Sequence, residues 1–537
     1  MAPWNLLAVS AAVLLVAVKP EYALLHSYAV TAAVFLAVTG LARFVYSAIL
    51  YPEFLSPIKH LPTPPGRSWI KGNTQSVFLE SPGQLAAKWI QTVPNNGLIR
   101  YYTVGNLERV LVTSPKALSE VLVTRGYEFP KTELARLQLA RLTGNGLLLA
   151  EGDEHKTQRK SLMPAFSYRH IKDLYPVFWA KGIEMIKEIE KELPSQDNIV
   201  EVRNWAGRTM LDILGLAGLG YDIGSIQDPD NELSRTYRDL VTEPSPWMKF
   251  IMLLGIFFIG PRLVMKLPLK RNRDFRAGAE YIRTVARQII REKKAQIESN
   301  DKASRDVDIL TAALTSGTFS EENLVDQMMT FLAAGHETTA SALQWSVYVL
   351  CKHPEMQQRL RDEVRANLPP ISVEDPAPVT AAAVDSLPYL NAFCNEVLRF
   401  YPPVPLTVRA VTRDTTIQGS RIPEGTILVI APEATNRDPE LWGPDADKFK
   451  PERWLGPGRA NSGGASSNYS FLTFLHGPRS CIGQGFARSE LACVVAALVG
   501  RFQMELKDPD AELRVRSTVT QAPLDGVISR FKVVEGW

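Results

Sequence analysis

The sequence predicts a mainly α-helical protein with small β-sheets, preceded by an N-terminal transmembrane helix or helical hairpin. Three observations lead to this prediction: an apolar N-terminus, long segments with helical spacing, and only short strand-like runs. The chain has 537 residues, 45% of them hydrophobic and 22% charged, so it can bury a large core. The formal net charge of +3 is too small and too dispersed to indicate a protein that binds nucleic acid.

The N-terminal 50 residues contain two apolar stretches. Residues 4–18 carry no charge, and the second stretch is cleanest between Leu24 and Ala42, close to the roughly 20 residues that a membrane-spanning helix requires. No basic region precedes the first stretch, which argues against a cleaved signal peptide. Whether residues 4–18 also span the membrane stays open. Positive charges follow the second stretch and favour a cytosolic body.

Three parts are expected along the chain. Residues 1–50 form the membrane anchor, residues 51–72 a proline-rich linker, and residues 73–537 the folded body that carries the chemistry. Closely spaced prolines fix the backbone angles of the linker and prevent a helix from continuing through it. We therefore expect the linker to be a stiff spacer.

Within the body, helix-like spacing or strong helix formers predict long helices at four places: 171–194, 276–299, 320–352 and 386–400. Strand-like runs are expected to pair at two places: 100–104 with 108–113, and 415–418 with 426–430. Two segments have the composition of loops: 366–386 and 456–468.

A further apolar stretch covers residues 247–268. Its uninterrupted core, from Phe250 to Pro261, is too short to span a membrane. Two interpretations are open for it: a helix of the core, or a surface element that dips into the membrane.

The cysteines exclude two classes of site. Four cysteines in a chain of this length, Cys351, Cys394, Cys481 and Cys493, cannot form a disulfide framework. No two of them form a C-x-x-C pair, so a structural zinc site is not expected either. We expect a reducing compartment, with at most one cysteine in a chemical role.

The segment from Phe474 to Gly483 carries the strongest chemical signal. Its single cysteine, Cys481, lies between Gly477 and Gly483, which let the backbone approach a large planar cofactor. Helical spacing follows Gly483, and the N-terminus of a helix favours an anionic thiolate. Turn N–H groups can bond to the sulfur, Phe474 can shield it from water, and Arg479 can neutralise a carboxylate. The alternative is a buried, inert cysteine, which is what we expect of the other three.

This segment, F-x-x-G-x-R-x-C-x-G, resembles the haem-binding signature of the cytochrome P450 superfamily at every fixed position. The resemblance covers roughly residues 60–537 and implies the cytochrome P450 fold, with haem b (iron protoporphyrin IX) as the cofactor. It implies that Cys481 is the axial ligand of the haem iron, and that four neighbours contact the haem: Phe474, Gly477, Arg479 and Gly483.

Three companion motifs occur in the order expected of that family. The first is the pair Glu396 and Arg399, which lie three residues apart on one helix face and can form an ion pair. In the family this pair joins a third arginine, here Arg453, in a buried network. Trp454 follows it, where the family often has Phe. An ordinary surface ion pair is the alternative.

The second motif runs from Ala334 to Thr339, in the long helix that begins near Ser320. Its glycine and hydroxyl residues are poor choices for the middle of a helix, which predicts a local opening. The motif resembles the family's oxygen-binding motif, in which Thr338 would orient bound dioxygen and water and Glu337 would help to deliver protons. A zinc-peptidase H-E-x-x-H motif is excluded because its second histidine is missing.

The third motif, residues 152–160, resembles the W-x-x-x-R element whose Trp and Arg contact a haem propionate. Arg159 fits this pattern, and His155 stands where Trp is usual but can still donate a hydrogen bond. Arg409 matches another propionate-binding arginine of the family. A solvated surface charge is the alternative for each arginine alone.

By resemblance, the protein is a haem-thiolate monooxygenase that inserts one atom of dioxygen into a lipophilic small molecule, by hydroxylation or epoxidation, in the specialised metabolism of a filamentous fungus. Cysteinate ligation favours O–O cleavage. No flavin or nicotinamide domain follows Gly483, so NADPH-dependent cytochrome P450 reductase is the expected electron donor, with cytochrome b5 as a second candidate. The expected location is the endoplasmic reticulum membrane, with the body in the cytosol.

Two alternative functions stay open. A haem-thiolate isomerase or dehydratase would rearrange peroxides without dioxygen or a reductase, although such relatives commonly lack an acid–threonine pair. A non-catalytic haem-binding membrane protein would not need proton-delivery residues. By resemblance, five residues face the substrate pocket: Phe331, Ala334, Val404, Leu406 and Leu524. They suit a hydrophobic ligand and identify no particular substrate.

Overall fold

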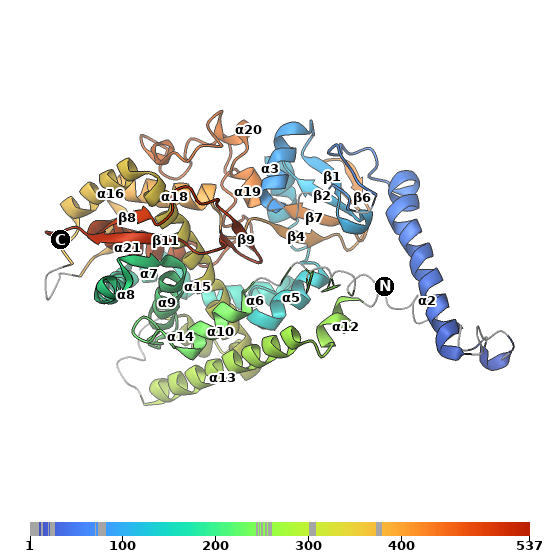
Figure 1. Ribbon diagram of the computed structural model, residues 1–537, viewed down its shortest axis with the longest axis horizontal. Helices are drawn as coiled ribbons and strands as arrows, with labels where there is room; N and C mark the ends of the chain where they lie inside the picture. The colour runs from blue at the N-terminus through green and yellow to red at the C-terminus, as the bar shows by residue number, and fades with distance from the viewer. Residues whose placement is uncertain are drawn as a thin grey trace.

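The protein is mainly helical, with its strands gathered in small sheets, as the sequence predicts (Figure 1). The structure is a computed structural model. It describes residues 27–69, 71–73, 82–242, 260–299, 308–371 and 378–537, together with shorter stretches between residues 10 and 21 and between residues 245 and 255.

The helices have these bounds: α2 (Tyr28–Val45), α3 (Pro82–Thr92), α4 (Pro115–Ser119), α5 (Glu133–Thr143), α6 (Gly152–Leu162), α7 (Tyr168–Ile171), α8 (Tyr175–Glu192), α9 (Val202–Ile213), α10 (Glu232–Leu240), α12 (Pro261–Lys266), α13 (Lys270–Glu298), α14 (Ile309–Thr315), α15 (Glu321–Lys352), α16 (Pro354–Asn367), α17 (Ala381–Asp385), α18 (Pro388–Phe400), α19 (Pro432–Thr435), α20 (Pro439–Trp442) and α21 (Gln484–Arg501). The four long helices that the sequence predicts correspond to α8, α13, α15 and α18.

The strands have these bounds: β1 (Leu98–Tyr102), β2 (Glu108–Val112), β3 (Ile199–Glu201), β4 (Thr407–Ala410), β5 (Thr415–Ile417), β6 (Ser420–Ile422), β7 (Ile427–Ile430), β8 (Phe502–Leu506), β9 (Val515–Ser517), β10 (Gln521–Pro523) and β11 (Ile528–Val533). The largest sheet has the order β1-β2-β7-β4, in which β2 and β7 run parallel and the other neighbours antiparallel.

The pairing of β1 with β2 is confirmed, but the predicted pairing of residues 415–418 with 426–430 is wrong. Strand β5 pairs instead with β6 across a turn at Gln418 and Gly419, which both have positive φ (48° and 76°). Two consecutive residues of positive φ favour a tight hairpin, so β5 takes its nearest neighbour. Strand β7, which is mostly buried, is then free to lie between β2 and β4.

Helix α15 is the central helix of the core. It packs against α9, α21, α5 and α13, and most of its residues are buried. It begins where the sequence predicts, because the hydroxyl of Ser320 accepts the N–H of Asn323 at 3.2 Å and caps the helix. Near its other end, Trp345 is buried and stacks on Tyr401 with ring centroids 4.1 Å apart. A charged side chain in the middle of such a helix must find a partner.

The predicted loop at 366–386 is partly wrong, because it contains the short helix α17. The hydroxyl of Thr380 accepts the N–H of Ala383 at 3.3 Å and caps this helix, a signal that the Pro- and Ala-rich composition hides. Residues 456–468 consist of turns and bends, which confirms the second predicted loop.

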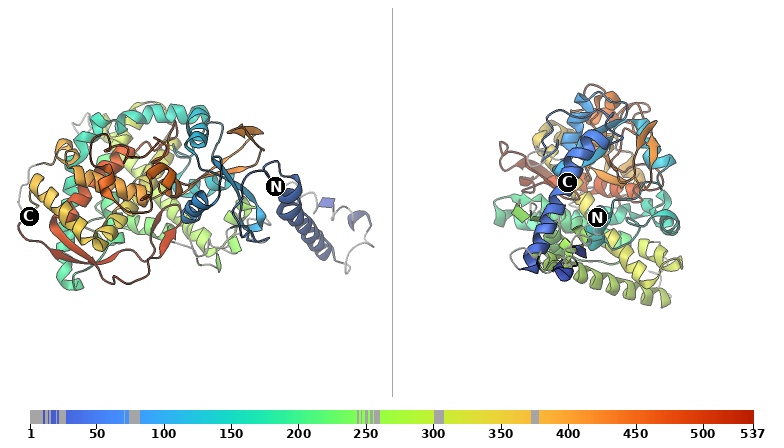
Figure 2. Two further views of the ribbon diagram at one scale, coloured as in Figure 1. Left: turned by 90° about the horizontal axis from the view of Figure 1, so that it is seen from above. Right: turned by 90° about the vertical axis from the view of Figure 1, so that its right-hand side faces the viewer.

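At the N-terminus, α2 continues through π-helical turns at Tyr46–Leu55. Together these 28 residues contain an 18-residue stretch with a mean hydropathy of 1.9 and form one helix that is long and apolar enough to cross a membrane. Figures 1 and 2 show α2 extending away from the rest of the molecule. Most of residues 4–18 lie outside the described residues, so the choice between one helix and a hairpin is not tested.

The described part of residues 51–72, the expected spacer, packs on the body. The side chain of Ile58 is 1% exposed and belongs to the same hydrophobic cluster as Leu98 and Leu118. The backbone carbonyl of Pro62 accepts the N–H of Arg100 at 2.9 Å. The domain limits at residues 50 and 73 therefore stay a prediction.

The apolar stretch at 247–268 lies partly outside the described residues. Trp247 is 67% exposed and Leu263, in α12, is 57% exposed, while Val264 is buried. These exposures favour a surface element over a core helix.

We expect a chain that begins at Leu61 to be less stable than one that begins at Ser47, because it lacks Ile58 and the carbonyl of Pro52, which accepts the Arg100 side chain at 2.9 Å. Burial of Ile58 alone is worth about 2 kcal/mol. Urea unfolding of both chains measures the difference, and Ile58→Ala in the longer chain should reproduce most of it. Equal stability of the two chains would contradict this assignment.

Candidate functional site

A cavity lies between α15 and the loop that carries Cys481. It is lined by eight of the residues that the sequence selects: His155, Arg159, Phe331, Ala334, Thr338, Arg479, Cys481 and Gly483. Helices α6 and α15 and the segment before α21 supply these residues, so motifs more than 300 residues apart in the chain meet at one place.

The Cys481 loop is held by its own backbone. The N–H of Cys481 donates to the carbonyl of Phe474 at 2.9 Å, and α21 begins three residues after the cysteine. Gly477 has a φ of 80°, and a Cβ there would lie 2.1 Å from the carbonyl oxygen of Leu122. Gly477 therefore allows a close approach of two backbone segments, and its expected role beside a cofactor stays a prediction. At Gly483 a Cβ would make only an ordinary contact at 3.7 Å.

Cys481 lines the cavity, so its side chain is open to the cavity although protein surrounds it. Burial raises the pKa of this thiol, while the backbone N–H of Gly483 and the charge of Arg159 lower it. The other cysteines lie elsewhere. Cys394 and Cys493 are buried, and burial raises the pKa of the Cys351 thiol to about 12. Cys481 is thus the cysteine placed for metal ligation.

Partly buried cations gather at one end of the cavity. Arg159 donates to the carbonyl of Ser480 at 2.7 Å, and Arg479 forms an ion pair with Glu151. Burial and the charges of Arg409 and Arg479 lower the pKa of Lys131, which also lines the cavity, to about 7. Burial, followed by the charge of Arg479, lowers the pKa of Arg409 to about 10. Among the described residues, only the carboxylate of Glu151 is seen to pair within this group of cations.

His155 is a neutral side chain in this group. Burial, with the charges of Arg479 and Arg159, lowers its pKa to about 4. Its Nδ1 lies 2.9 Å from the hydroxyl of Tyr127. If Tyr127 donates this hydrogen bond, the ring proton sits on Nε2, which leaves Nε2 as a donor, as the sequence analysis expects.

The donor set fits a haem. A thiol supplies a metal ligand, and uncompensated buried cations are costly unless an anion joins them. A haem carries two carboxylates and would supply that charge. On this fit, Cys481 would bind the iron, while Lys131, Arg159 and Arg479 would bind the carboxylates.

Thr338 and Glu337 lie on different faces of α15. The hydroxyl of Thr338, which lines the cavity, donates to the carbonyl of Ala334 at 2.8 Å. The carboxylate of Glu337 points elsewhere and accepts hydrogen bonds from Arg516 at 2.8 Å and Thr520 at 3.0 Å. Helix α15 is unbroken at these residues, so the predicted local opening is not present.

Glu396, Arg399 and Arg453 form one buried network, as the resemblance implies. Arg399 donates to both carboxylate oxygens of Glu396, at 2.8 and 2.7 Å, and Arg453 donates to Oε1 at 3.0 Å. The indole of Trp454 and the backbone N–H of Lys450 add two more donors, at 2.9 and 2.7 Å. The network joins α18 to the segment that leads to the Cys481 loop.

Of the five residues expected at the substrate pocket, Phe331 and Ala334 line the cavity. Val404, Leu406 and Leu524 are half-buried and lie outside its lining. Their segments adjoin, because the N–H of Gln521 donates to the carbonyl of Pro403 at 2.8 Å. Their role in binding substrate stays a prediction.

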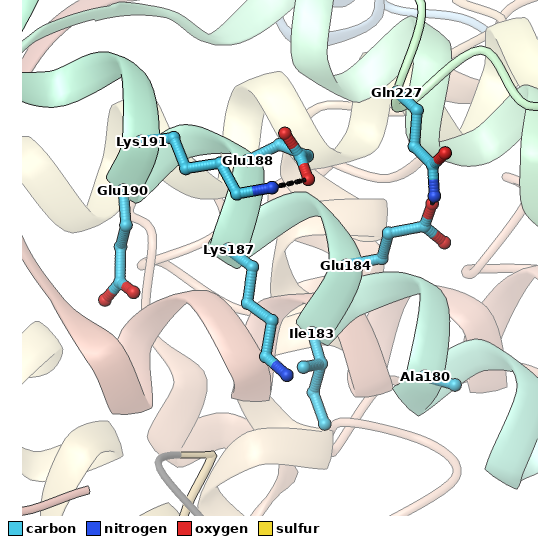
Figure 3. Close-up of a pocket in the computed structure, with 8 residues that line it drawn as sticks. All are labelled: Ala180, Ile183, Glu184, Lys187, Glu188, Glu190, Lys191 and Gln227. Carbon is cyan, nitrogen blue, oxygen red and sulfur yellow. Dashed lines mark hydrogen bonds and ion pairs between the residues drawn. The ribbon is translucent and has the colours of Figure 1, made fainter. Parts of the chain in front are cut away.

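A second hollow lies on the outer face of α8 (Figure 3). Its glutamates already have partners: Glu188 pairs with Lys191 at 2.5 Å, and Glu184 accepts from Gln227 at 2.8 Å. No residue that the sequence analysis predicts for the active site lines this hollow. It is therefore not a candidate for the active site.

Several residues of the site carry no signal that sequence reasoning could use. Tyr127, Lys131 and Glu151 belong to no recognised motif, and Arg516 lies 179 positions from its partner Glu337. For Glu151 the sequence offers one indication of its place in the site, because this residue immediately precedes the helix that carries His155.

The family model for cytochrome P450 matches residues 62–527. The chain is 54% identical over 523 residues to cytochrome P450 monooxygenase sphH of Aspergillus fumigatus, covering 97% of this chain and 96% of that protein. It is 44% identical to cytochrome P450 monooxygenase FSL4 of Gibberella zeae, covering 92% of each chain. It is 42% identical to cytochrome P450 monooxygenase FUM15 of Gibberella moniliformis, covering 92% and 90%.

Cys481→Ala should abolish the red-shifted absorption band of the reduced carbon-monoxide complex, because it removes the thiolate that would bind the iron. The same change at Cys351, Cys394 or Cys493 should leave the band in place, since these thiols do not line the cavity. A band that survives Cys481→Ala would exclude this cysteine as the iron ligand.

Glu396→Ala should destabilise the protein by about 3–5 kcal/mol, because it leaves Arg399 buried without its carboxylate. The matched control is Glu452→Ala, which breaks an exposed pair with Arg359 and should cost about 1 kcal/mol or less. Urea unfolding compares the two variants. Equal losses would show that burial does not set the strength of this network.

Proposed function

The chain belongs to the cytochrome P450 family, and from this premise we propose that it is a membrane-anchored haem-thiolate monooxygenase acting on a lipophilic small molecule. The observation that carries the proposal is that Cys481 and Thr338 line the same cavity. The curated relatives are named monooxygenases and come from filamentous fungi, which supports an oxygen-inserting enzyme of specialised metabolism.

Haem b is the proposed cofactor. When bound, haem supplies the iron at which dioxygen is activated with electrons from a reductase. The chain's part is to hold it: Cys481 ligates through its thiolate, and the N–H of Gly483 hydrogen-bonds to the sulfur. Lys131, Arg159 and the neighbouring arginines hold the carboxylates, with His155 as a neutral donor.

Proton transfer is the second task of the chain. The hydroxyl of Thr338 donates to the carbonyl of Ala334 and still has two lone pairs that can accept a proton donor. After rotation about its C–O bond, the same hydroxyl can donate into the cavity. Glu337 is the adjacent acid that can supply the proton.

The substrate side of the cavity is apolar. Phe166 and Phe331 lie with ring centroids 5.7 Å apart, and Leu214 and Ile309 also line the space. Such walls exclude water and favour a hydrophobic ligand. They support a lipophilic substrate and do not define which carbon is oxidised.

Electrons are proposed to come from NADPH-dependent cytochrome P450 reductase, with cytochrome b5 as a further donor. The apolar helix at Tyr28–Leu55 supports attachment to a membrane. We propose the endoplasmic reticulum, with the body on the cytosolic side, because positive charges follow the apolar stretch in the sequence.

The two alternatives make different demands. An isomerase that rearranges peroxides needs no proton supply for dioxygen, yet Thr338 lies on the cavity and Glu337 adjoins it in the helix. A non-catalytic haem protein needs neither Thr338 nor Glu337 for proton transfer. The relatives are named monooxygenases, which also favours the monooxygenase for this chain.

The proposal is tested by deleting the gene and profiling metabolites for an accumulated precursor that lacks one oxygen. Full-length protein with the reductase should convert this precursor while consuming NADPH and dioxygen. Conversion without reductase and without dioxygen would favour the isomerase, and no NADPH consumption with the reductase present would favour the non-catalytic protein.

Thr338→Ala should lower the product formed per NADPH by about tenfold or more, because the variant lacks the hydroxyl that transfers protons. NADPH consumption should continue, with peroxide released in place of product. The control is Thr284→Ala on α13, whose exposed hydroxyl makes the same bond to the fourth preceding carbonyl, at 2.9 Å. Normal coupling in both variants would remove Thr338 from the mechanism.

A further inference from the structure

A second, polar cavity adjoins α15 on a different face from the Cys481 cavity. Helices α9 and α10, α15 and strand β9 enclose it, with a lining that includes Arg203, Tyr237, Arg238, Glu337, Gln344 and Arg516. Whereas Phe331 and Ala334 face the Cys481 cavity, Glu337 and Gln344 face this one. One helix therefore separates the apolar side of the Cys481 cavity from a polar cavity.

The carboxylate of Glu337 is fixed in this polar cavity from outside its own helix. Its Oε1 accepts hydrogen bonds from Nη2 of Arg516 at 2.8 Å and from the hydroxyl of Thr520 at 3.0 Å. The side chain of Arg516 is 3% exposed, so this is a buried, charge-assisted bond. The other terminal nitrogen of Arg516 donates to the carbonyl of Val241 at 3.1 Å.

The hairpin that carries Arg516 and Thr520 is itself anchored on α15. Strands β9 and β10 pair antiparallel, with Arg516 opposite Ala522. The carbonyl of Gln521 accepts the hydroxyl of Ser341 at 2.5 Å and the indole N–H of Trp345 at 3.2 Å. Because both partners lie on the helix that carries Glu337, the guanidinium and the carboxylate are held in fixed register.

Three buried polar atoms on this cavity have no hydrogen-bond partner among the described residues: Nε of Arg516, the hydroxyl of Tyr237 and Oε1 of Gln344. An unpaired buried polar group costs about 1–3 kcal/mol. A donor, an acceptor and a hydroxyl that is both match the bonds that a water molecule makes. The lining of this cavity therefore includes polar atoms that no described residue satisfies.

We propose that Arg516 and Thr520 are positioning residues for Glu337: from the β9–β10 hairpin they hold its carboxylate in the polar cavity for the proton transfer proposed above. This inference rests on the monooxygenase function proposed above. In each transfer one proton passes to the Glu337 carboxylate and then onward, which restores the carboxylate. No electrons move in this step.

Other charged and titratable groups line or adjoin the cavity. These groups are Glu201, Arg203, Tyr237, Arg238, His336 and Arg516. Burial lowers the pKa of His336, so this imidazole is neutral at physiological pH, and burial keeps Tyr237 protonated by raising its pKa. Arg516 is the cation in direct contact with Glu337.

The test uses the full-length protein with its reductase and the precursor isolated from the deletion strain. Arg516→Gln should raise the peroxide released per NADPH and lower the product by about tenfold, the scale of one charge-assisted bond. Arg516→Lys should restore much of the product and lower the peroxide release again, because it keeps a cation at this position.

The matched control is Arg514→Gln, two positions earlier, where an exposed arginine pairs with Asp525 at 2.7 Å. This variant should behave as the wild type. Arg516→Gln combined with Glu337→Gln should be no worse than Glu337→Gln alone, because a positioning residue acts through its partner. Wild-type coupling in Arg516→Gln, or an additional loss in the double variant, would overturn the proposal.

If Arg516→Gln does not retain the carbon-monoxide band, Thr520→Val decides, since it removes one hydrogen bond to Glu337 and nearly preserves shape. It should raise peroxide release by a smaller factor, and wild-type coupling in it would count against the proposal. A wild type that converts the precursor without dioxygen would overturn the proposed function itself. Failure confined to the Arg516 and Thr520 variants overturns only their positioning role.

Discussion

The buried carboxylate of Glu396 is the constraint on which the site depends. A charge at 0% exposure is tolerated only when donors surround it, and five hydrogen bonds converge on this carboxylate. Their donors come from α18 and from residues 450–454, so satisfying one charge fixes the path of the chain that leads to Cys481. Arg399 extends the constraint by donating to the carbonyls of Asn436 and Ala446, at 2.6 and 2.8 Å.

The two cavities beside α15 differ in the charged groups that line them. Around Cys481 the fold collects more cations than carboxylates, and a haem would supply two negative charges there. Around Glu337 the fold provides Arg516 as a direct partner of the carboxylate. The helix periodicity of about 100° per residue places neighbours such as Glu337 and Thr338 on different faces, which lets one helix serve both spaces.

The motif around Cys481 is recognised from residues that suit a cofactor. The structure shows that contacts within the protein also determine its shape, at Gly477 and at Cys481. The Gly477 position requires glycine because a side chain would collide with the carbonyl of Leu122, and this contact holds the loop against the segment after α4. Cys481 lies just before the first turn of α21, where the unpaired backbone N–H groups favour an anion. The loop is thus shaped by its neighbours in the fold as well as by the cofactor it would hold.

The sequence by itself determined the elements whose causes are local. Apolar spacing and helix formers predicted α8, α13, α15 and α18, and the spacing around Cys481 predicted the ligand loop before α21. Tertiary structure alone decided the partners that are distant in the chain. Strand β7 lies between β2 and β4, Tyr127 reaches His155, and Arg516 holds Glu337 from 179 positions away. Local propensity is a property of adjacent residues, whereas such contacts depend on how the whole core closes, which no short pattern encodes.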